Sequence, residues 1–323
     1  MRNRKVLVTG GAGFIGSNLT ESLLDAGNEV VCLDNFSTGK RNNIESFKEN
    51  PRFRLIEGDI RNYDDCIKAV QGVEFVFHEA ALGSVPRSIK DPITTTDVNI
   101  GGFVKMLFAS KEAGVKRFIY AASSSTYGDH PDLPKVEDKI GSPLSPYAIT
   151  KYVNELYADI FAKTYGIEVI GLRYFNVFGR RQDTYGAYAA VIPKFVKSLM
   201  QLQRPKINGD GSVSRDFTYI DNVLQVNHLA AIVNDINALN QVYNVAHGER
   251  TTLNQLYSII REKASTLEQG IKNIEPEYGP FRAGDIPHSL ASIDKAKRLL
   301  GYSPTHNVEH GLEEAVKWYW NNL

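Results

Sequence analysis

A glycine-rich turn near the amino end constrains the fold of this chain more than any other feature. Directly after the apolar run Lys5–Thr9 come Gly10, Gly13, Phe14, Ile15 and Gly16 in a G-x-x-G-x-x-G pattern, and a helical pattern follows. Glycine allows a tight turn and a close approach to a pyrophosphate, whose charge the free N–H groups of a helix start stabilise. A strand before and a helix after separate such a turn from an ordinary glycine loop. The turn predicts a parallel α/β domain that binds a dinucleotide.

Short β-branched runs alternate with longer helical patterns over the first half of the chain. Such alternation is typical of βαβ units. We therefore predict an α/β fold, a Rossmann-like doubly wound parallel sheet of six or seven strands, with a smaller α/β substrate domain. The expected strands are Lys5–Thr9, Glu29–Asp34, Phe53–Glu57, Phe75–His78, Arg117–Ala122 and Glu168–Tyr174, and the expected helices are Gly16–Ala26, Tyr63–Val70, Ile93–Ala113 and Tyr147–Tyr165.

The pattern changes after Asn176, where Gly and Pro interrupt it more often. Expected strands Arg215–Tyr219 and Gln241–Val245 flank a helix near Ile220–Val233, and we expect this part to return to the sheet. We predict a dinucleotide-binding domain at residues 1–175, to which 213–247 return. Residues 176–212 and 248–323 would form the smaller domain.

Charge and cysteine content limit the partners and the compartment. The 37 Lys and Arg residues balance the 37 Asp and Glu residues, so no overall field attracts nucleic acid or a membrane surface. No apolar run approaches the ~18 residues of a membrane span, and the first expected strand leaves no room for a leader. Cys32 and Cys66 lack the spacing of a metal or redox site. We expect a soluble, cytoplasmic protein without a metal.

The residues after the second and third expected strands bear on the choice of dinucleotide. Asp34 ends the second strand about 20 residues after the turn, where a carboxylate accepts hydrogen bonds from ribose hydroxyls and repels a 2′-phosphate. This favours NAD over NADP, although Lys40 and Arg41 in the next loop leave NADP open. Asp59 could reach the adenine, but a solvated turn residue is an equal interpretation.

Tyr147 and Lys151 form a Y-x-x-x-K pair at the start of an expected helix. Their spacing places both side chains on one helix face. An ammonium group near a phenol favours the phenolate, so Tyr147 could act as a general base near neutral pH. Ser123 opens the run Ser123-Ser124-Ser125 at the end of the fifth expected strand, where ligands of open α/β sheets bind. Alone, such a pair is more often an ordinary feature of a helix surface.

With these elements in order, the chain resembles the extended short-chain dehydrogenase/reductases. Within them it resembles the UDP-hexose 4-epimerases, and most of all the bacterial UDP-N-acetylglucosamine 4-epimerases. The resemblance covers nearly the whole length. It rests further on Asp34-Asn35 with Ser37-Thr38-Gly39, on Asp59-Ile60, His78-Glu79-Ala80-Ala81, Asn99, Arg173-Tyr174-Phe175-Asn176, Arg215-Asp216-Phe217 and Arg282-Ala283-Gly284-Asp285-Ile286.

The resemblance implies a mechanism. Tyr147 would remove the proton of the sugar 4-hydroxyl while C4 gives a hydride to NAD, Ser123 would bridge the sugar oxygen, and Lys151 would bind the nicotinamide ribose. The 4-keto sugar would then take the hydride back on its other face. The implied cofactor residues are Gly10, Gly13, Phe14, Ile15, Gly16, Asp34, Asn35, Ser37, Thr38, Gly39, Asp59, Ile60, Ala80, Ala81, Asn99, Tyr147, Lys151 and Tyr174.

The UDP-sugar would be bound by a second set of residues. Two of them are arginines, which make directional, charge-assisted hydrogen bonds to phosphate oxygens. The implied substrate residues are Gly83, Ser84, Ser123, Ser124, Ser125, Tyr147, Asn176, Ala190, Val191, Asn208, Arg215, Arg282, Asp285 and Ser289.

Three departures from related families narrow the expected substrate. Dehydratases place an acidic pair where this chain has Ser124 and Ser125. The Leu82-Gly83-Ser84 loop differs from the lysine-containing loop of glucose/galactose epimerases, and Ser289 replaces their bulky tyrosine. Serine leaves room for a 2-acetamido group, a difference typically worth about 1–3 kcal/mol. We predict an isomerase that interconverts UDP-N-acetylglucosamine and UDP-N-acetylgalactosamine, with some turnover of UDP-glucose and UDP-galactose.

Two alternatives stay open, and one partner is expected besides the substrate. A UDP-glucuronate 4-epimerase would need a cation for the C6 carboxylate, for which Arg87 is a candidate. A non-catalytic NAD-binding protein of the same fold would not need Ser123, Tyr147 and Lys151. The helices Ile93–Ala113 and Tyr147–Tyr165 carry apolar residues on more than one face, so we expect a homodimer formed through them.

Overall fold

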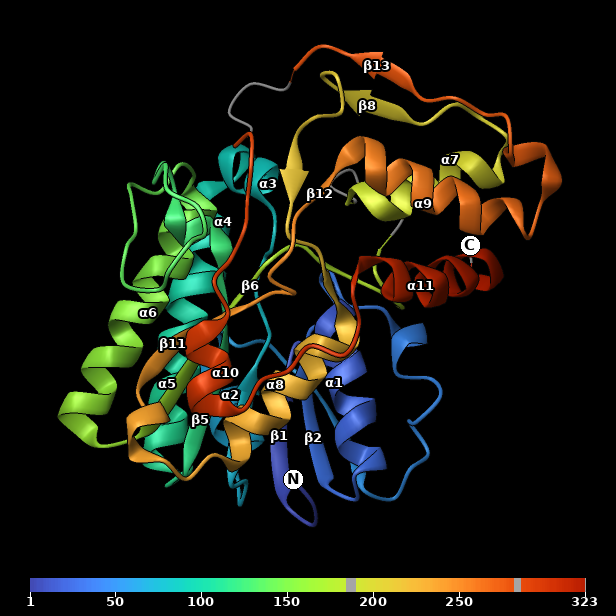
Figure 1. Cartoon of the computed structure of the whole chain (residues 1–323). Helices are drawn as coiled ribbons and strands as arrows, with labels where there is room; N and C mark the ends of the chain where they lie inside the picture. Colours follow the sequence, from blue (N-terminus) through green and yellow to red (C-terminus); the bar gives the residue numbers. More distant parts are fainter. Residues whose placement is uncertain (184–189, 282–285, 323) are drawn as a thin grey trace.

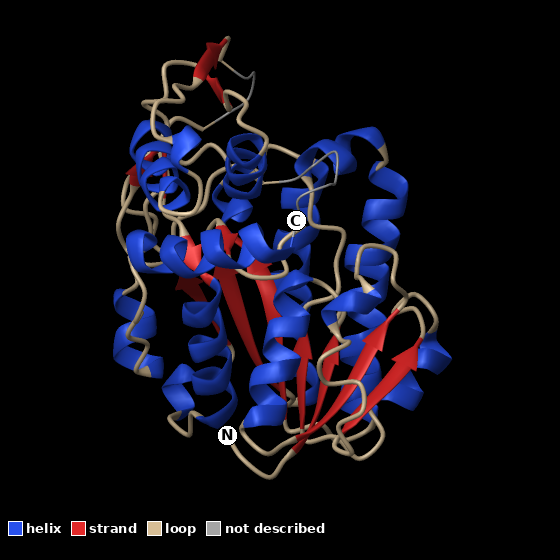
Figure 2. Ribbon diagram, turned by 90° about the vertical axis from the view of Figure 1, so that its right-hand side faces the viewer, coloured by secondary structure: helices blue, strands red, loops and turns tan. Residues whose placement is uncertain are grey.

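A seven-stranded parallel sheet forms the centre of the molecule (Figures 1 and 2). The structure is a computed structural model, and it describes residues 1–183, 190–281 and 286–322. The strand order is β11-β6-β5-β4-β1-β2-β3, and each neighbouring pair is parallel. The strands are β1 (Lys5–Thr9), β2 (Glu29–Asp34), β3 (Phe53–Glu57), β4 (Phe75–His78), β5 (Arg117–Ser123), β6 (Glu168–Tyr174) and β11 (Gln241–Val245).

Helices cover both faces of this sheet because neighbouring residues of a strand point to opposite sides. Val6 and Val8 of β1 pack in one apolar cluster with residues of α1 (Phe14–Asp25) and α8 (Ile220–Ile232). Leu7 packs in the other cluster with α2 (Tyr63–Ala69), α5 (Phe103–Glu112) and α6 (Pro146–Tyr165). The predicted doubly wound α/β fold is confirmed.

The strand order reverses direction between β1 and β4. From β1 the chain builds β2 and β3 on one side, and it then crosses back to build β4, β5 and β6 on the other. Open α/β sheets bind ligands at such a switch point, outside the carboxyl ends of the strands. The glycine-rich turn follows β1 at this place.

The prediction of one regular α-helix over Ile93–Ala113 was wrong in one respect: the chain is helical over nearly this whole range, but the helix contains a π-helical turn. The chain forms α4 (Pro92–Thr96), a π-helical turn over Asp97–Gly102, and then α5. A Cβ atom on Gly102 would lie 2.5 Å from Cδ1 of Ile60, so the backbone here packs directly against the loop after β3. π-helical turns within helices often mark functional sites, and this one carries Asn99.

The prediction of one strand over Arg215–Tyr219 was also wrong. Two short strands, β9 (Ser214–Arg215) and β10 (Thr218–Tyr219), pair with different partners outside the main sheet. Between them the fully buried Asp216 accepts backbone N–H groups from His247, Gly248 and Ala291. The buried carboxylate turns the chain there and joins three segments.

A second group of elements lies above the carboxyl edge of the sheet (Figure 1). Its helices are α7 (Val191–Met200), α9 (Leu253–Ser265) and α11 (Val308–Asn322), and its short strands are β8 (Lys206–Asn208), β12 (Thr251–Thr252) and β13 (Glu277–Gly279). The remaining elements are α3 (Val85–Lys90), β7 (Val177–Phe178) and α10 (Asp294–Leu300). Among residues 1–183, 190–281 and 286–322, no helix combines the length and apolar character that crossing a membrane requires.

Candidate active site

A cavity of about 530 Å³ opens at the carboxyl ends of β1, β2, β4, β5 and β6. It therefore occupies the switch point of the sheet. Most of the predicted cofactor residues line it, from segments more than 100 positions apart in the chain. They are Gly10, Gly13, Phe14, Ile15, Gly16, Asp34, Asn35, Ser37, Thr38, Asp59, Ile60, Ala80, Ala81, Tyr147, Lys151 and Tyr174.

The glycine-rich turn at one end of this cavity leaves no space for side chains. Gly10 has φ 66°, and a Cβ atom on it would lie 2.8 Å from Cα of Ala80. A Cβ atom on Gly16 would lie 2.1 Å from the carbonyl oxygen of Gly10. Gly13 begins α1 and offers no side-chain cap, so the first N–H groups of the helix stay available to a ligand. This turn fits the pyrophosphate of a dinucleotide.

Asp34 connects the glycine turn to the loop after β2. Its Oδ2 accepts the N–H of Ala12 at 2.9 Å, and its Oδ1 accepts the N–H of Phe36 at 2.7 Å. Burial raises the pKa of Asp34 above its usual range, although these two hydrogen bonds oppose the shift. Each carboxylate oxygen keeps a further lone pair, so Asp34 can still accept ribose hydroxyls. A Cβ atom on Gly39 would lie 2.9 Å from Oδ1 of Asp34, so the loop after β2 passes close to this carboxylate.

Asp59 lies farther along the same cavity and is held in its charged form. Arg61 Nη2 donates to its Oδ2 at 2.7 Å, and Asn35 Nδ2 donates to the same oxygen at 2.8 Å. The Arg61 hydrogen bond is the main reason that the pKa of Asp59 falls to about 2. Protein groups thus already bind the carboxylate at this end of the cavity, and its neighbours Gly58 and Ile60 also line the cavity.

Tyr147, Lys151 and Ser123 meet at the other end of the cavity. Helix α6 begins at Pro146, and the N-cap Ser145 accepts the N–H of Ala148 at 3.1 Å, which places Tyr147 in the first turn. Lys151 Nζ donates to the carbonyl of Ala121 in β5 at 2.7 Å. Ser123 lies close enough to Tyr147 to affect the pKa of the phenol, and all three residues line the cavity. The sequence-predicted catalytic residues are therefore together in one place.

The pKa values of this group differ from what the helix spacing suggested. Burial raises the pKa of Tyr147 above its usual value, and the hydrogen bond with Ser123 opposes the shift. Burial lowers the pKa of Lys151 to about 8. Lys151 donates to a backbone carbonyl, and its charge is not among the causes that shift the pKa of Tyr147. Additional positive charge in the cavity is needed to lower the pKa of Tyr147.

A buried ion pair fixes α6 to the sheet behind these residues. Glu155 lies one helical turn after Lys151, and its carboxylate binds the guanidinium of Arg173 in β6 through two hydrogen bonds of 2.9 and 2.7 Å. Both side chains are buried. Two parallel hydrogen bonds restrict the orientation of both groups, so the position of α6 relative to β5 and β6 is well defined.

A second cavity of about 190 Å³ lies among the elements above the sheet. Four predicted substrate residues line it: Asn176, Val191, Asn208 and Arg215. Asn176 also lines the main cavity, and its positive φ of 35° is uncommon for a residue other than glycine. Such backbone strain is often found at functional sites. The two cavities thus meet at one residue.

The other predicted substrate residues have different positions. Gly83 and Ser124 line the main cavity. Ser84 is the N-cap of α3 and accepts the N–H of Arg87 at 3.2 Å, while Ser125 Oγ donates to Ser123 Oγ at 2.8 Å. In the described part of the chain neither serine lines a cavity, so both support their neighbours.

Four further predictions concern the substrate side. Ala190 is the exposed N-cap of α7. The N–H of Ser289 donates to the carbonyl of Ser214 at 3.1 Å, so its segment runs beside β9, the strand that carries Arg215. Arg282 and Asp285 lie outside the described residues.

Asn99 differs from the other predicted cofactor residues. Its Oδ1 accepts the N–H of Leu82 at 2.8 Å, and its Nδ2 donates to Thr150 Oγ1 at 3.1 Å. Neither Asn99 nor Gly39 is among the described residues that line the main or the second cavity. Asn99 instead ties the loop after β4 to α6, and so it holds two walls of the main cavity together.

Sequence reasoning assigned no role to several residues that line the cavities. In the main cavity they include Glu79, Leu82, Val98, Val177 and Gln182. In the second cavity they are Phe195, Lys206, Ile207, Val213, Phe217 and Leu253. Glu79 belongs to the motif His78-Glu79-Ala80-Ala81, which did indicate the site. The sequence offered no evident partner for its carboxyl group.

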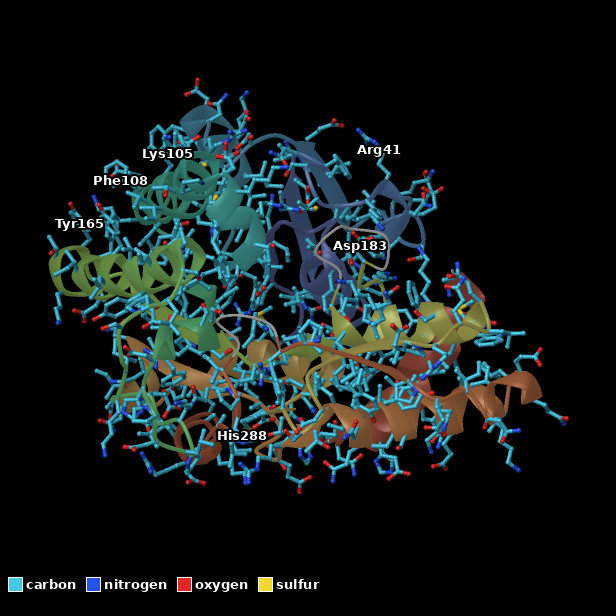
Figure 3. All side chains as sticks on the ribbon, turned by 90° about the horizontal axis from the view of Figure 1, so that it is seen from above. Arg41, Lys105, Phe108, Tyr165, Asp183 and His288 are labelled. Carbon is cyan, nitrogen blue, oxygen red and sulfur yellow. The ribbon has the colours of Figure 1, made fainter. Side chains whose placement is uncertain are left out.

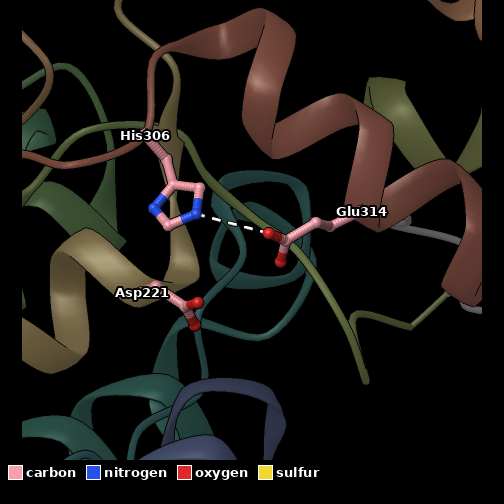
Figure 4. A group of neighbouring side chains, drawn as sticks. All are labelled: Asp221, His306 and Glu314. Atoms are coloured by element: carbon pink, nitrogen blue, oxygen red, sulfur yellow. Dashed lines mark ion pairs between the residues drawn. The ribbon is translucent and has the colours of Figure 1, made fainter.

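A separate charged group joins α8 to α11 (Figure 4). Asp221, His306 and Glu314 have ligand atoms within 4.8 Å of one another, and His306 Nε2 lies 3.3 Å from Glu314 Oε1. Arg180 already binds Asp221 at 2.7 Å, and the Tyr219 hydroxyl donates to Glu314 at 2.7 Å. These contacts fit a polar connection between the two helices, because the carboxylates are neutralised or hydrogen-bonded by protein groups.

Comparison with known proteins identifies relatives over the whole chain. Residues 6–246 match the model of the NAD dependent epimerase/dehydratase family. A putative UDP-glucose 4-epimerase of Methanocaldococcus jannaschii is 35% identical over 98% of this chain and 99% of its own length.

Solved structures give the same result. A UDP-N-acetylglucosamine 4-epimerase from Methanobrevibacter ruminantium, in complex with UDP-N-acetylmuramic acid, is 38% identical, with a TM-score of 0.93 and 100% of both chains covered. A UDP-glucuronic acid 4-epimerase from Bacillus cereus, in complex with UDP-glucuronic acid and NAD, is 32% identical, with a TM-score of 0.89, over 99% of this chain and 100% of the other.

Proposed function

This chain belongs to the NAD dependent epimerase/dehydratase family, and from this premise we propose that it is a UDP-N-acetylhexosamine 4-epimerase. It would interconvert UDP-N-acetylglucosamine and UDP-N-acetylgalactosamine. The observation that carries the reaction type is the meeting of Tyr147, Ser123 and Lys151 in the cavity at the switch point of the sheet. The relatives named above, all 4-epimerases of UDP-sugars, support it.

NAD is the cofactor of this family, and the main cavity fits it. The glycine turn would hold the pyrophosphate, Asp34 would accept the ribose hydroxyls at the adenine end, and Lys151 would donate to the nicotinamide ribose. When bound, NAD would supply reversible hydride acceptance at the sugar C4, and its oxidised ring would add a positive charge. Such a charge would favour a lower pKa of Tyr147.

The proton of the sugar 4-hydroxyl would pass to Tyr147. Ser123 lies near Tyr147 and lines the same cavity, so one sugar oxygen could contact both hydroxyl groups. Positioned proton transfer of this kind contributes about 10²–10⁴-fold to a rate. Ser124 and Ser125, in place of an acidic pair, support epimerisation over elimination.

The UDP part would occupy the second cavity. Asn176, Val191, Asn208 and Arg215 line it, and Arg215 would bind the diphosphate. Because Asn176 also lines the main cavity, the sugar would lie at the junction, within reach of Tyr147. Arg282, Asp285, Ala190 and Ser289 remain proposed substrate residues, as do Ser84 and Ser125 through their neighbours.

Ser289 supports the choice of an N-acetylated sugar. Its backbone pairs with Ser214, next to Arg215, and a serine leaves more space there than a tyrosine. The test is a panel of UDP-sugars with the wild type and Ser289→Tyr, the products being resolved by chromatography. The variant should lose turnover of UDP-N-acetylglucosamine by about 10-fold or more relative to UDP-glucose, as expected for 1–3 kcal/mol of lost fit.

The same panel decides among the alternatives. A preference for UDP-glucuronate would contradict the proposal and would direct attention to Arg87, a residue of α3 that, within the described chain, lines neither cavity. No turnover of any UDP-sugar by protein that retains NAD would instead indicate a non-catalytic NAD-binding protein. An unchanged preference in Ser289→Tyr would remove the selectivity argument only.

The division of the chain also remains a proposal. Residues 1–175 with the returning 213–247 would hold NAD, and 176–212 with 248–323 would hold the UDP-sugar. The pairing of β11 with β6 supports the return.

We further propose a homodimer formed through α5 and α6. Apolar side chains on α6 are exposed, with Ile149 and Leu156 at 49% and Ile160 at 54%. Phe108 of α5 and Tyr165 of α6 lie on the same side of the molecule (Figure 3), and Lys111 lies over both rings. Exposed apolar patches of this kind favour protein contacts. Sedimentation should give a dimer for the wild type and a monomer for Ile160→Glu, and a monomeric wild type would contradict the proposal.

A further inference from the structure

A carboxyl group without an assigned role lines the main cavity. Glu79 directly follows His78 at the carboxyl end of β4, and it shares the cavity with Lys151 and Tyr174. Carboxyl groups withdrawn from water remain charged only when neighbouring groups compensate the charge. The neighbours of Glu79 therefore decide what it does.

Two hydrogen bonds connect Glu79 to helix α8 through Tyr174. The Tyr174 hydroxyl donates to Glu79 Oε1 at 2.8 Å. Asn227 Nδ2, on α8, donates to the Tyr174 hydroxyl oxygen at 2.9 Å. Because Asn227 supplies the proton of the second bond, the Tyr174 proton is directed at Glu79, whose oxygen must be an acceptor. This pair of hydrogen bonds links the carboxyl ends of β4 and β6 to α8.

Charges couple Glu79 to Lys151. Burial raises the pKa of Glu79 to about 7, while the Tyr174 hydrogen bond and the charge of Lys151 oppose the shift. Burial lowers the pKa of Lys151 to about 8, and the charges of Glu79 and then Glu155 oppose that shift. His78 stays neutral, because burial and Lys151 lower its pKa to about 3. Glu79 and Lys151 thus stabilise each other's charged form.

We propose that Glu79 is a positioning residue of the active site, whose carboxylate is the counter-charge that keeps Lys151 an ammonium ion and holds Tyr174 beside it. The proposal rests on the function proposed above, in which Lys151 binds the nicotinamide ribose. The competing explanation is structural, with Glu79 serving only as the hydrogen-bond acceptor of Tyr174. The two explanations differ in whether the charge or the hydrogen bond matters.

Two substitutions separate the charge from the hydrogen bond. Glu79→Gln keeps an acceptor for Tyr174 and removes the charge, whereas Tyr174→Phe keeps the carboxylate and removes the hydrogen bond. The bound cofactor is first removed from the protein, and the affinity for NADH is then measured by NADH fluorescence between about pH 6 and pH 10. The pH dependence of this affinity reports the protonation state of Lys151. In the wild type the affinity should fall around pH 8, where Lys151 loses its proton.

The expected result is a larger shift of that midpoint in one variant than in the other. Glu79→Gln should lower the midpoint by about one pH unit, because an opposite charge nearby typically moves a pKa by about 1–3 units. Tyr174→Phe should lower it by clearly less, because it keeps the carboxyl group and removes only a hydrogen bond that opposes the rise in the pKa of Glu79. An unchanged midpoint in Glu79→Gln would overturn the proposal, and so would an equal shift in Tyr174→Phe.

Two additions keep the test decisive. Glu79→Asp retains the charge and should keep the wild-type midpoint, so a lowered midpoint there would also overturn the proposal if Glu79→Gln failed to fold. The pH profile of kcat on the UDP-sugar should show the same displacement of its alkaline limb. A shifted NADH midpoint without any turnover would contradict the proposed function and leave the role of Glu79 intact.

Discussion

The main cavity and the second cavity are built in different ways. Strands of four to seven residues, all in one parallel sheet, end at the main cavity, and short turns carry its lining residues. The second cavity is formed around strands of two or three residues and by helices α7 and α9. Local sequence patterns therefore define the first cavity, whereas packing between distant segments defines the second. We infer that changes in the first affect cofactor binding and chemistry, and that changes in the second affect substrate affinity.

The largest expected effect tests the chemistry of the main cavity. Tyr147→Phe should lower kcat by about 10³-fold, because positioned proton transfer is lost, while NAD remains bound and KM changes little. Tyr165→Phe, at the exposed end of the same helix, is the matched control and should retain activity. Measured rates and the absorbance of retained cofactor check both statements. A Tyr147→Phe variant with near-normal kcat would show that another group moves the proton.

Cofactor retention tests the glycine turn next. The Cβ atom of Gly16→Ala would lie 2.1 Å from the carbonyl oxygen of Gly10, so the turn must change and NAD should be lost on purification. Gly279→Ala, whose nearest atom lies 3.8 Å away, should retain it. If Gly16→Ala kept a full complement of NAD, the assignment of the pyrophosphate to this turn would be wrong.

The second cavity should respond in KM. Arg215→Ala removes charge-assisted hydrogen bonds worth about 1.5–3 kcal/mol, which corresponds to about a 10- to 100-fold increase in KM. Cofactor content should not change, because Arg215 lines the second cavity only. Arg250→Ala, an exposed arginine before β12, serves as the control. A loss of NAD in Arg215→Ala would break the separation between the two cavities.

The smallest expected effect concerns stability and pH. Burial raises the pKa of Asp216 to about 7 from an ordinary value of 3.8, although three backbone N–H groups oppose the shift. The folded protein therefore binds this proton more tightly than the unfolded chain, and its contribution to stability is lost as the pH rises from about 4 to about 7. Thermal unfolding of Asp216→Asn should vary less over that range than that of the wild type.

Two observations sharpen this last prediction. Asp138→Asn, an exposed control, should leave the pH dependence of unfolding unchanged. Glu79 titrates in the same direction, so Asp216→Asn should remove only part of the wild-type slope. An unaltered slope would mean that Asp216 stays charged when folded.

The sequence predicts the main cavity more completely than the second cavity, because local patterns define the first and contacts between distant segments define the second. Strand bounds in the first half agree because each strand is a short apolar run between turns, and only β5 extends one residue farther than expected, to Ser123. The π-helical turn before α5 was missed because it packs against Ile60, which lies 42 positions from Gly102 and is not part of the local pattern. The break at Asp216 was missed because its partners are His247, Gly248 and Ala291.

Side-chain partners were the least accessible part of the site. The spacing of Tyr147 and Lys151 placed them on one helix face, but only the folded chain shows that Lys151 donates to Ala121. Likewise, the role inferred for Glu79 depends on Tyr174 and Asn227, which are 95 and 53 positions from their respective partners. Such contacts belong to tertiary structure and leave no local pattern.

The most direct test of the proposed function is a single incubation. The purified protein, without added NAD, is mixed with UDP-N-acetylglucosamine that carries deuterium at C4 of the sugar. The products are separated by chromatography, and their masses are measured by mass spectrometry. We predict UDP-N-acetylgalactosamine that retains the deuterium at C4, since the same site removes and returns it. Absence of this product, or a product that has exchanged its deuterium for solvent hydrogen, would contradict the account.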